Sequence, residues 1–165
     1  MMGDITTAKV DAIVNAANVA MLGGGGVDGA IHKAAGPELF EECKKVQAEN
    51  GIRCPVGEAR ITGAGSIPVK YIVHTVEPKY FDDENPKSLL ESAYRNSLKL
   101  ARQYSCLSVA FPAISCGVYR YPLEEAAEVS VSVCNESEFS GIKKQFYLMS
   151  VDLYQLWSRK VADVS

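Results

Sequence analysis

Metal-binding side chains are scarce in this sequence of 165 residues. It has two histidines, His32 and His74, and five cysteines that are irregularly spaced and form no C-x-x-C pair. A structural zinc site needs clustered thiolate and imidazole ligands, so we expect no metal site. An odd number of irregularly spaced cysteines is typical of free thiols in a reducing compartment, which predicts a cytoplasmic protein.

Dense positive charge and long apolar runs are absent as well. The 17 basic and 20 acidic residues give a net charge of −3, and Lys or Arg never occur three in a row. We therefore expect neither a nucleic acid nor a membrane surface as a partner. No apolar stretch approaches the ~20 residues that span a bilayer, and the N-terminus does not resemble a secretory signal. An anionic ligand would have to be held mainly by backbone N–H groups.

The chain length and the pattern of apolar residues indicate one α/β domain that covers residues 1–165. The predicted strands cover residues 10–15, 58–62, 71–76, 107–111 and 145–151, and the predicted helices cover residues 27–35, 37–48, 87–104, a segment opened by Pro122, and 153–161. This alternation predicts a largely parallel sheet, in which ligands bind beyond the carboxyl ends of the strands. The loops after residues 14 and 111 are therefore the candidate binding loops.

The first candidate loop contains four consecutive glycines, residues 23–26, followed directly by a predicted helix. Glycine permits positive φ and a close approach of the backbone to a ligand. The N-terminus of a helix offers unpaired N–H groups and a partial positive charge, which suit a phosphate group. An ordinary surface loop is the alternative, but it leaves the position of the glycines at a helix entry without explanation.

Gly24, Gly26 and Gly29 also satisfy the G-x-G-x-x-G spacing of dinucleotide-binding folds. That fingerprint requires an acidic residue about 20 positions later, at the end of a second strand. Residues 37–48 have a helical pattern where this strand should lie. We therefore reject a nicotinamide dinucleotide site.

Polar side chains flank the glycines on both sides. Asn15 and Asn18 follow the predicted strand, where an amide either caps a turn or hydrogen-bonds ligand hydroxyls. Asp28 stands at the helix entry, where a carboxylate is favoured as a capping charge and is also placed to act on a ligand. His32 lies one turn later and should share a helix face with Asp28.

The second candidate loop follows Phe111 and is again rich in small residues. Ala113, Ser115 and Gly117 resemble a nucleophile elbow, but a serine hydrolase of that fold requires a histidine after the serine, and both histidines precede residue 115. Cys116 has no demonstrable histidine partner, so a packed thiol is the better interpretation. What remains is a set of N–H groups that can face phosphates.

Together these segments resemble the macro domain family. The matching pieces are residues 3–6, 10–18, 23–36, 57–62, 71–75 and 111–122, in the order of the family and over nearly the whole chain. The glycine-aspartate segment is highly specific, and the branch it resembles is the MacroD-type hydrolases. The resemblance implies a three-layer α/β/α fold with a mixed, mainly parallel sheet and an ADP-ribose cleft across its top.

The resemblance also implies roles for individual residues. Asp4 would bond the adenine amino group, and Ile5 would contact the neighbouring ring edge. Asn15 and Asn18 would line the distal ribose, and Asp28 would help to activate the attacking water, which makes these three the predicted catalytic residues. The other predicted substrate-binding residues are Gly24, Gly25, Gly26, Val27, His32, Ser115, Cys116, Gly117, Val118 and Tyr119.

The implied activity is hydrolysis of an ester attached to ADP-ribose by an activated water, without metal, cofactor or covalent enzyme intermediate. The substrate would be O-acetyl-ADP-ribose, mono-ADP-ribosylated acidic side chains of proteins, or both. The alternative is a non-catalytic module that binds ADP-ribose as a reader. The intact set of Asn15, Asn18 and Asp28 favours the enzyme.

Three features depart from the family pattern. The sequence begins almost at the adenine-binding segment, where relatives usually supply a preceding strand, so we expect a missing strand or a different sheet edge. Arg120 stands where relatives often have glycine, and Glu77 also replaces a common glycine.

Overall fold

The computed structural model describes residues 1–114 and 120–164, and within them it contains one five-stranded sheet. The strand order is β2-β3-β1-β4-β5, with β2 antiparallel to β3 and the other neighbouring pairs parallel. The expectation of a mixed, mainly parallel sheet is confirmed. The strands are β1 (Ala12–Ala17), β2 (Ala59–Thr62), β3 (Tyr71–Val76), β4 (Ser108–Phe111) and β5 (Lys143–Phe146).

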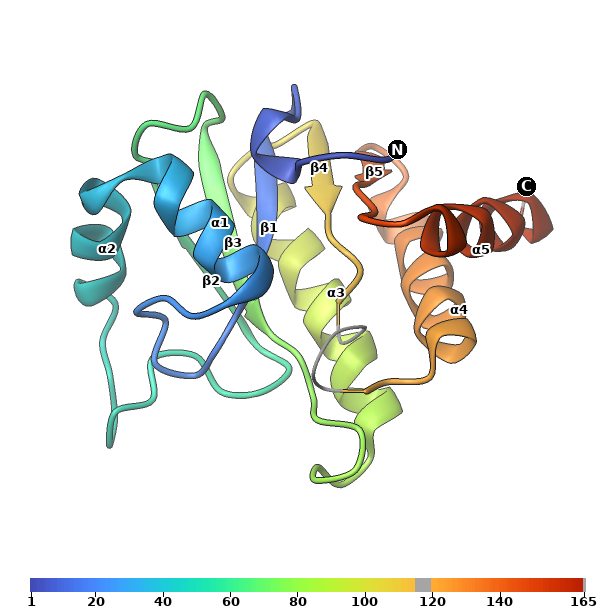
Figure 1. The fold of residues 1–165 in the computed structure, drawn as a ribbon, viewed down its shortest axis with the longest axis horizontal. Coiled ribbons are helices and arrows are strands. Elements are labelled where there is room, and N and C mark those ends of the chain that lie inside the picture. The colour runs from blue at the N-terminus through green and yellow to red at the C-terminus, as the bar shows by residue number, and fades with distance from the viewer. Residues whose placement is uncertain (115–119, 165) are drawn as a thin grey trace.

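Helices cover both faces of the sheet and give the three expected layers (Figure 1). One face carries α1 (Gly26–Ala35) and α2 (Pro37–Lys44), and the other carries α3 (Pro86–Gln103), α4 (Leu123–Cys134) and α5 (Val151–Asp163). Two short 3₁₀ helices, η1 (Ile5–Thr7) and η2 (Ser137–Phe139), complete the described elements. Among the described residues, no helix is long and apolar enough to cross a membrane.

Strand β1 shows how the sheet divides the core into two halves. Ala12 and Val14 belong to the cluster packed against α3 and α4, whereas Ile13 and Ala17 belong to the cluster packed against α1 and α2. Successive side chains on a strand point to opposite faces, so this alternation follows from the period of two. Asn15 occupies a position of the second set, which directs its side chain toward α1.

Some predicted boundaries were wrong. The last strand ends at Phe146 rather than residue 151, and α5 begins at Val151, because the Ser150 side chain accepts a hydrogen bond from Leu153 N and caps the helix there. Helix α2 ends at Lys44 rather than residue 48, where Val46 N bonds to Cys43 O and tightens the chain into a turn.

Strand β1 begins later than predicted and continues through Ala17, because its last residues pair in parallel register with His74, Thr75 and Val76 of β3. The four cysteines of the described residues are buried and free, as expected; they are Cys43, Cys54, Cys106 and Cys134.

The N-terminal residues lie along the outer side of the chain that leaves β5. Met2 forms an isolated parallel bridge with Leu148, and Gly3 N donates to Leu148 O at 3.2 Å. In the described residues, the N-terminal segment thus meets this side of the sheet through one isolated bridge, and the expectation of a missing strand or a different sheet edge stays untested. Because Leu148 follows the carboxyl end of β5, this bridge brings Asp4 to the same edge of the sheet as the loops after β1 and β4.

Helix α3 anchors the larger half of the core, and we predict that Leu98→Ala lowers the free energy of unfolding by about 2–5 kcal/mol. Leu98 is fully buried with Leu90 and Tyr94 on the same helix face, so truncation leaves a cavity. Urea unfolding followed by the fluorescence of Trp157, the single tryptophan, measures the loss. Leu107→Ala is the matched control, since that leucine is 70% exposed, and an equal loss in both variants would contradict the packing.

Candidate functional site

The centre of the candidate site is a hydrogen bond between the end of β1 and the first turn of α1. Asn15 on β1 is fully buried, and its Nδ2 donates to Asp28 Oδ1 at 2.8 Å. The same Nδ2 lies 3.1 Å from Nδ1 of His74, which stands level with Asn15 on β3. The chain between β1 and α1, residues 18–25, is called the glycine loop below. Its two ends are thus tied together by side chains inside the fold.

His74 fixes the orientation of the Asn15 amide. Its Nε2 lies 2.9 Å from Thr62 Oγ1, and that hydroxyl donates to Gly63 O at 2.8 Å. Because the hydroxyl proton is used there, Nε2 is the donor to Thr62, and Nδ1 accepts from Asn15. Burial, with a smaller contribution from His32, lowers the pKa of His74 to about 3, so the ring is neutral in this chain of bonds.

This arrangement leaves one acceptor of Asn15 unused. Asn15 Oδ1 is buried and has no hydrogen-bond partner among the described residues. An unpaired buried acceptor costs roughly 1–3 kcal/mol, and native structures retain few of them. Its place at the carboxyl end of β1 makes it a candidate acceptor for a ligand hydroxyl.

Asp28 is an almost buried carboxyl group, 4% exposed. Burial raises its pKa, while the bond from Asn15 and the charge of His32 lower it, and the net direction is upward. His32 Nε2 lies 3.4 Å from Asp28 Oδ1, so these two residues share a helix face as expected. Helix α1 has Gly25 as its N-cap and no side-chain capping bond, so Asp28 is not the cap of the helix.

Asn18 holds the glycine loop in shape. Its Oδ1 accepts from Met21 N at 3.0 Å, and its Nδ2 donates to Gly23 O at 3.0 Å. Of the two interpretations of this amide, the turn cap is therefore the one that these contacts support. Contact of Asn18 with a ligand stays a prediction.

Glycine is required at positions 24 and 29, because the backbone, the Asp28 carboxyl and the Asn18 amide lie close together there. A Cβ on Gly24 would lie 3.1 Å from Asp28 Oδ2, and a Cβ on Gly29 would lie 2.6 Å from Gly24 O. Within the described part of the chain, the N–H groups of residues 24–27 donate to no acceptor. N–H groups in this position at the start of a helix suit an anion, and anion binding by residues 24–27 stays a prediction.

The other predicted residues fall into two groups. Asp4 is exposed and accepts from Thr6 N at 2.9 Å, and Ile5 is buried in the half of the core formed by α1 and α2. Ser115, Cys116, Gly117, Val118 and Tyr119 lie outside the described residues. Arg120, which follows them, has a φ of 57°, in the left-handed region that glycine adopts without strain. This conformation accounts for the glycine common at that position.

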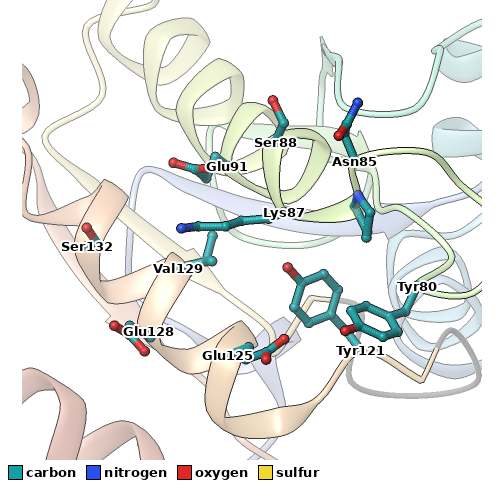
Figure 2. Close-up of a pocket in the computed structure, with 11 residues that line it drawn as sticks. Tyr80, Asn85, Lys87, Ser88, Glu91, Tyr121, Glu125, Glu128, Val129 and Ser132 are labelled. Atoms are coloured by element: carbon teal, nitrogen blue, oxygen red, sulfur yellow. The ribbon is translucent and has the colours of Figure 1, made fainter.

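A separate hollow of about 660 Å³ lies between the start of α3 and α4 (Figure 2). Glu91, Glu125 and Glu128 line it together with Tyr80 and Tyr121. Burial raises the pKa of Tyr121 to about 12, and the negative charge of Glu125 makes a smaller contribution in the same direction. The hydroxyl of Tyr121 therefore stays neutral. The three carboxylates of this hollow outnumber the one lysine among its described lining residues, Lys87, which disfavours a phosphate. The described residues that line the hollow include none of the predicted site residues.

The comparison with protein families decides the classification. A model of the Macro domain matches residues 14–130. The chain belongs to the macro domain family. It is 57% identical to a macro domain-containing protein of Vibrio parahaemolyticus, over 95% of this chain and 92% of that protein. It is also 54% identical to an O-acetyl-ADP-ribose deacetylase of Escherichia fergusonii, over 92% of this chain and 86% of that protein.

A solved macrodomain agrees with the fold. The structure of the Oceanobacillus iheyensis macrodomain with ADP matches 99% of this chain and 88% of that one, at 39% identity and a TM-score of 0.91. In the present macro domain, sequence reasoning missed the part played by Thr62 and His74. The available signal was a polar side chain at a buried position of an otherwise apolar strand, but its partners come from other parts of the chain.

We predict that Gly29→Ala lowers the free energy of unfolding by about 1–3 kcal/mol, because the new methyl group overlaps Gly24 O. Gly25→Ala is the matched control: φ is −92° there, and nothing lies within 4 Å of the added Cβ. Urea unfolding of both variants checks the expectation. A smaller loss in Gly29→Ala than in Gly25→Ala would show that the loop backbone does not approach α1 as described.

The neutral state of His74 predicts a loss of stability in acid. Its folded-state pKa of about 3 lies below the ordinary value of 6.5, so the unfolded chain binds a proton that the folded chain does not. The stabilisation is complete above about pH 6.5 and declines as the pH falls toward 3, by up to about 1.4 kcal/mol per pH unit. Urea unfolding between pH 3 and 7 should show a shallower decline for His74→Gln than for wild type. If the free energy of unfolding declined equally with falling pH in both proteins, the imidazole of His74 would not be neutral and buried as described.

Proposed function

We propose that this macro domain binds ADP-ribose and hydrolyses the acetyl ester of O-acetyl-ADP-ribose. The observation that carries the proposal is the buried pair of Asn15 and Asp28 beside the free amides of the glycine loop. Its relatives support the ester as substrate, since several proteins 52–56% identical to this chain are named O-acetyl-ADP-ribose deacetylases.

The proposed binding mode uses the carboxyl edge of the parallel strands. The N–H groups of residues 24–27 would hold the diphosphate, because they have no acceptor among the described residues and stand at the positive end of α1. Asp4 and Ile5, beyond β5, would contact adenine, and the glycine loop beyond β1 would surround the distal ribose. Asn15 Oδ1 would accept a hydrogen bond from a ribose hydroxyl, which satisfies its unused lone pair.

In the proposed reaction, Asp28 is the general base. It takes a proton from a water whose oxygen adds to the ester carbonyl carbon. The bond from that carbon to the ribose oxygen then breaks, and the ribose oxygen takes the proton back from Asp28. The products are acetate and ADP-ribose. The raised pKa of Asp28 makes it a better proton acceptor near neutral pH, and bound phosphates would raise it further. The bond from Asn15 holds the carboxylate in place, and the step requires neither a metal nor a covalent intermediate.

The same chemistry extends to mono-ADP-ribosylated proteins. ADP-ribose on an acidic side chain is joined through an ester, so the same base and water would release it. We therefore propose mono-ADP-ribosylated proteins as a second substrate. The ratio of kcat/KM for the two substrates shows which one the enzyme prefers.

We predict that Asp28→Ala and Asp28→Asn reduce kcat for O-acetyl-ADP-ribose by about 10²–10⁴-fold, because a positioned base contributes that much. The Kd for ADP-ribose, from calorimetry, should change by only a few-fold in Asp28→Asn. Turnover is measured by chromatography of the released ADP-ribose. The control is Asp82→Asn, because Asp82 is an exposed aspartate of the β3–α3 loop.

Wild-type turnover in both Asp28 variants would remove Asp28 from the mechanism. Tight ADP-ribose binding without hydrolysis of either ester by the wild-type protein would instead assign a reader.

A further inference from the structure

Glu77 is an acidic residue beside the candidate site that the proposed mechanism does not use. It follows β3 directly, and its neighbour Val76 is paired with Ala17 at the end of β1. Glu77 therefore lies next to the start of the glycine loop, at the carboxyl edge of the sheet. The bond from Gly57 N to Val76 O, 2.8 Å long, holds the strand end in place.

Glu77 is half-buried, and its Oε2 is buried without a countercharge. Its Oε2 has no hydrogen-bond partner among the described residues, and no ion pair to Glu77 is found there. A buried polar atom without a partner is unfavourable, and an ionised one is far more so. A protonated carboxyl fits such a place, since its hydroxyl is a donor that a ligand oxygen can accept.

The neighbouring charges favour the same state. Burial raises the pKa of Glu77 to about 8, and the negative charge of Asp28 on α1 contributes in the same direction, while a hydrogen bond from the backbone N–H of Glu77 itself acts the other way. Other titratable groups around the glycine loop are His32, His74 and Arg53, whose guanidinium donates to Ala20 O. The thiols of Cys43 and Cys54 also lie there, and burial raises the pKa of each to about 11, so both are neutral. Of the charges in the described residues, that of Asp28 is the one that acts on Glu77.

We propose that Glu77 is a second carboxyl group of the substrate site, which stays protonated at neutral pH and donates a hydrogen bond to an oxygen of the bound ester. The two neighbouring carboxyl groups then have different roles in the reaction: Asp28 is the ionised base, and Glu77 is the neutral hydrogen-bond donor. Deprotonation of Glu77 removes the donor and adds a negative charge near an anionic substrate. This inference rests on the proposed function.

The test is the dependence of kcat/KM on pH, between about 6 and 9.5, with O-acetyl-ADP-ribose and subtraction of spontaneous hydrolysis. Wild type should lose activity above about pH 8, approaching tenfold per pH unit. Glu77→Gln keeps an N–H donor that does not titrate, so its kcat/KM should stay level over that range. Glu77→Leu has no donor and should be at least tenfold less active at pH 7. Glu84→Gln, an exposed glutamate of the same β3–α3 loop, should follow wild type.

Thermal unfolding of the same variants separates folding from chemistry. The folded-state pKa of about 8 lies above the ordinary value of 4.5, so the folded chain holds a proton that the unfolded chain releases. The Tm of Glu77→Gln minus that of wild type should grow between about pH 4.5 and 8 and then level off. A constant difference would overturn the buried neutral carboxyl, whatever the activities are.

An alkaline decline shared by wild type and Glu77→Gln would overturn the donor role while leaving the proposed function intact. If wild type hydrolyses neither ester, the proposed enzyme fails, and the Kd for ADP-ribose against pH then tests Glu77. Weaker binding above about pH 8 in wild type but not in Glu77→Gln supports Glu77 as a ligand contact. Identical profiles reject it.

Discussion

The site depends on one buried hydrogen bond, from Asn15 Nδ2 to Asp28 Oδ1. It joins a strand to the helix that follows it and closes the glycine loop between them. Because both side chains are almost fully buried, the bond acts in a medium of low polarity, where an unpaired amide or carboxylate would be costly. Any rearrangement of the loop that separates these groups would leave both without their partner.

The polar groups behind this bond explain how it keeps one geometry. Thr62, His74 and Asn15 form a continuous chain of donors and acceptors that begins at Gly63 O and ends at Asp28. Burial keeps the imidazole neutral, and a neutral ring has one donor and one acceptor, so every orientation along the chain is determined. The result is an amide oxygen without a partner among the described residues, and a carboxylate whose Oδ2 lies beside Gly24.

Negative charge is concentrated in two different settings on this molecule. Near the glycine loop, Asp28 is buried and Glu77 is half-buried with a buried Oε2, and burial raises the pKa of each. Between α3 and α4, Glu125 and Glu128 are exposed to water and line an open hollow (Figure 2). Backbone amides at the start of α1 supply the positive end of a helix in the first setting, which makes it the one suited to a diphosphate.

The sequence by itself determined the fold class, the alternation of strands and helices, and the place of the glycine loop at a strand's carboxyl end. These features follow from local periodicity and from the conformational freedom of glycine, which act over a few residues. It also placed Asp28 and His32 on one helix face, because their spacing of four residues is one turn.

Tertiary structure alone decided how distant residues combine. The partners of His74 come from β1, β2 and α2. Glu77 reaches the surroundings of Asp28 only because β3 lies beside β1 in the sheet. Burial, which sets the proton affinity of His74, Asp28 and Glu77, is likewise a property of the packed layers. The physical reason is that pairing between strands and desolvation depend on contacts between residues far apart in the chain, which no local pattern records.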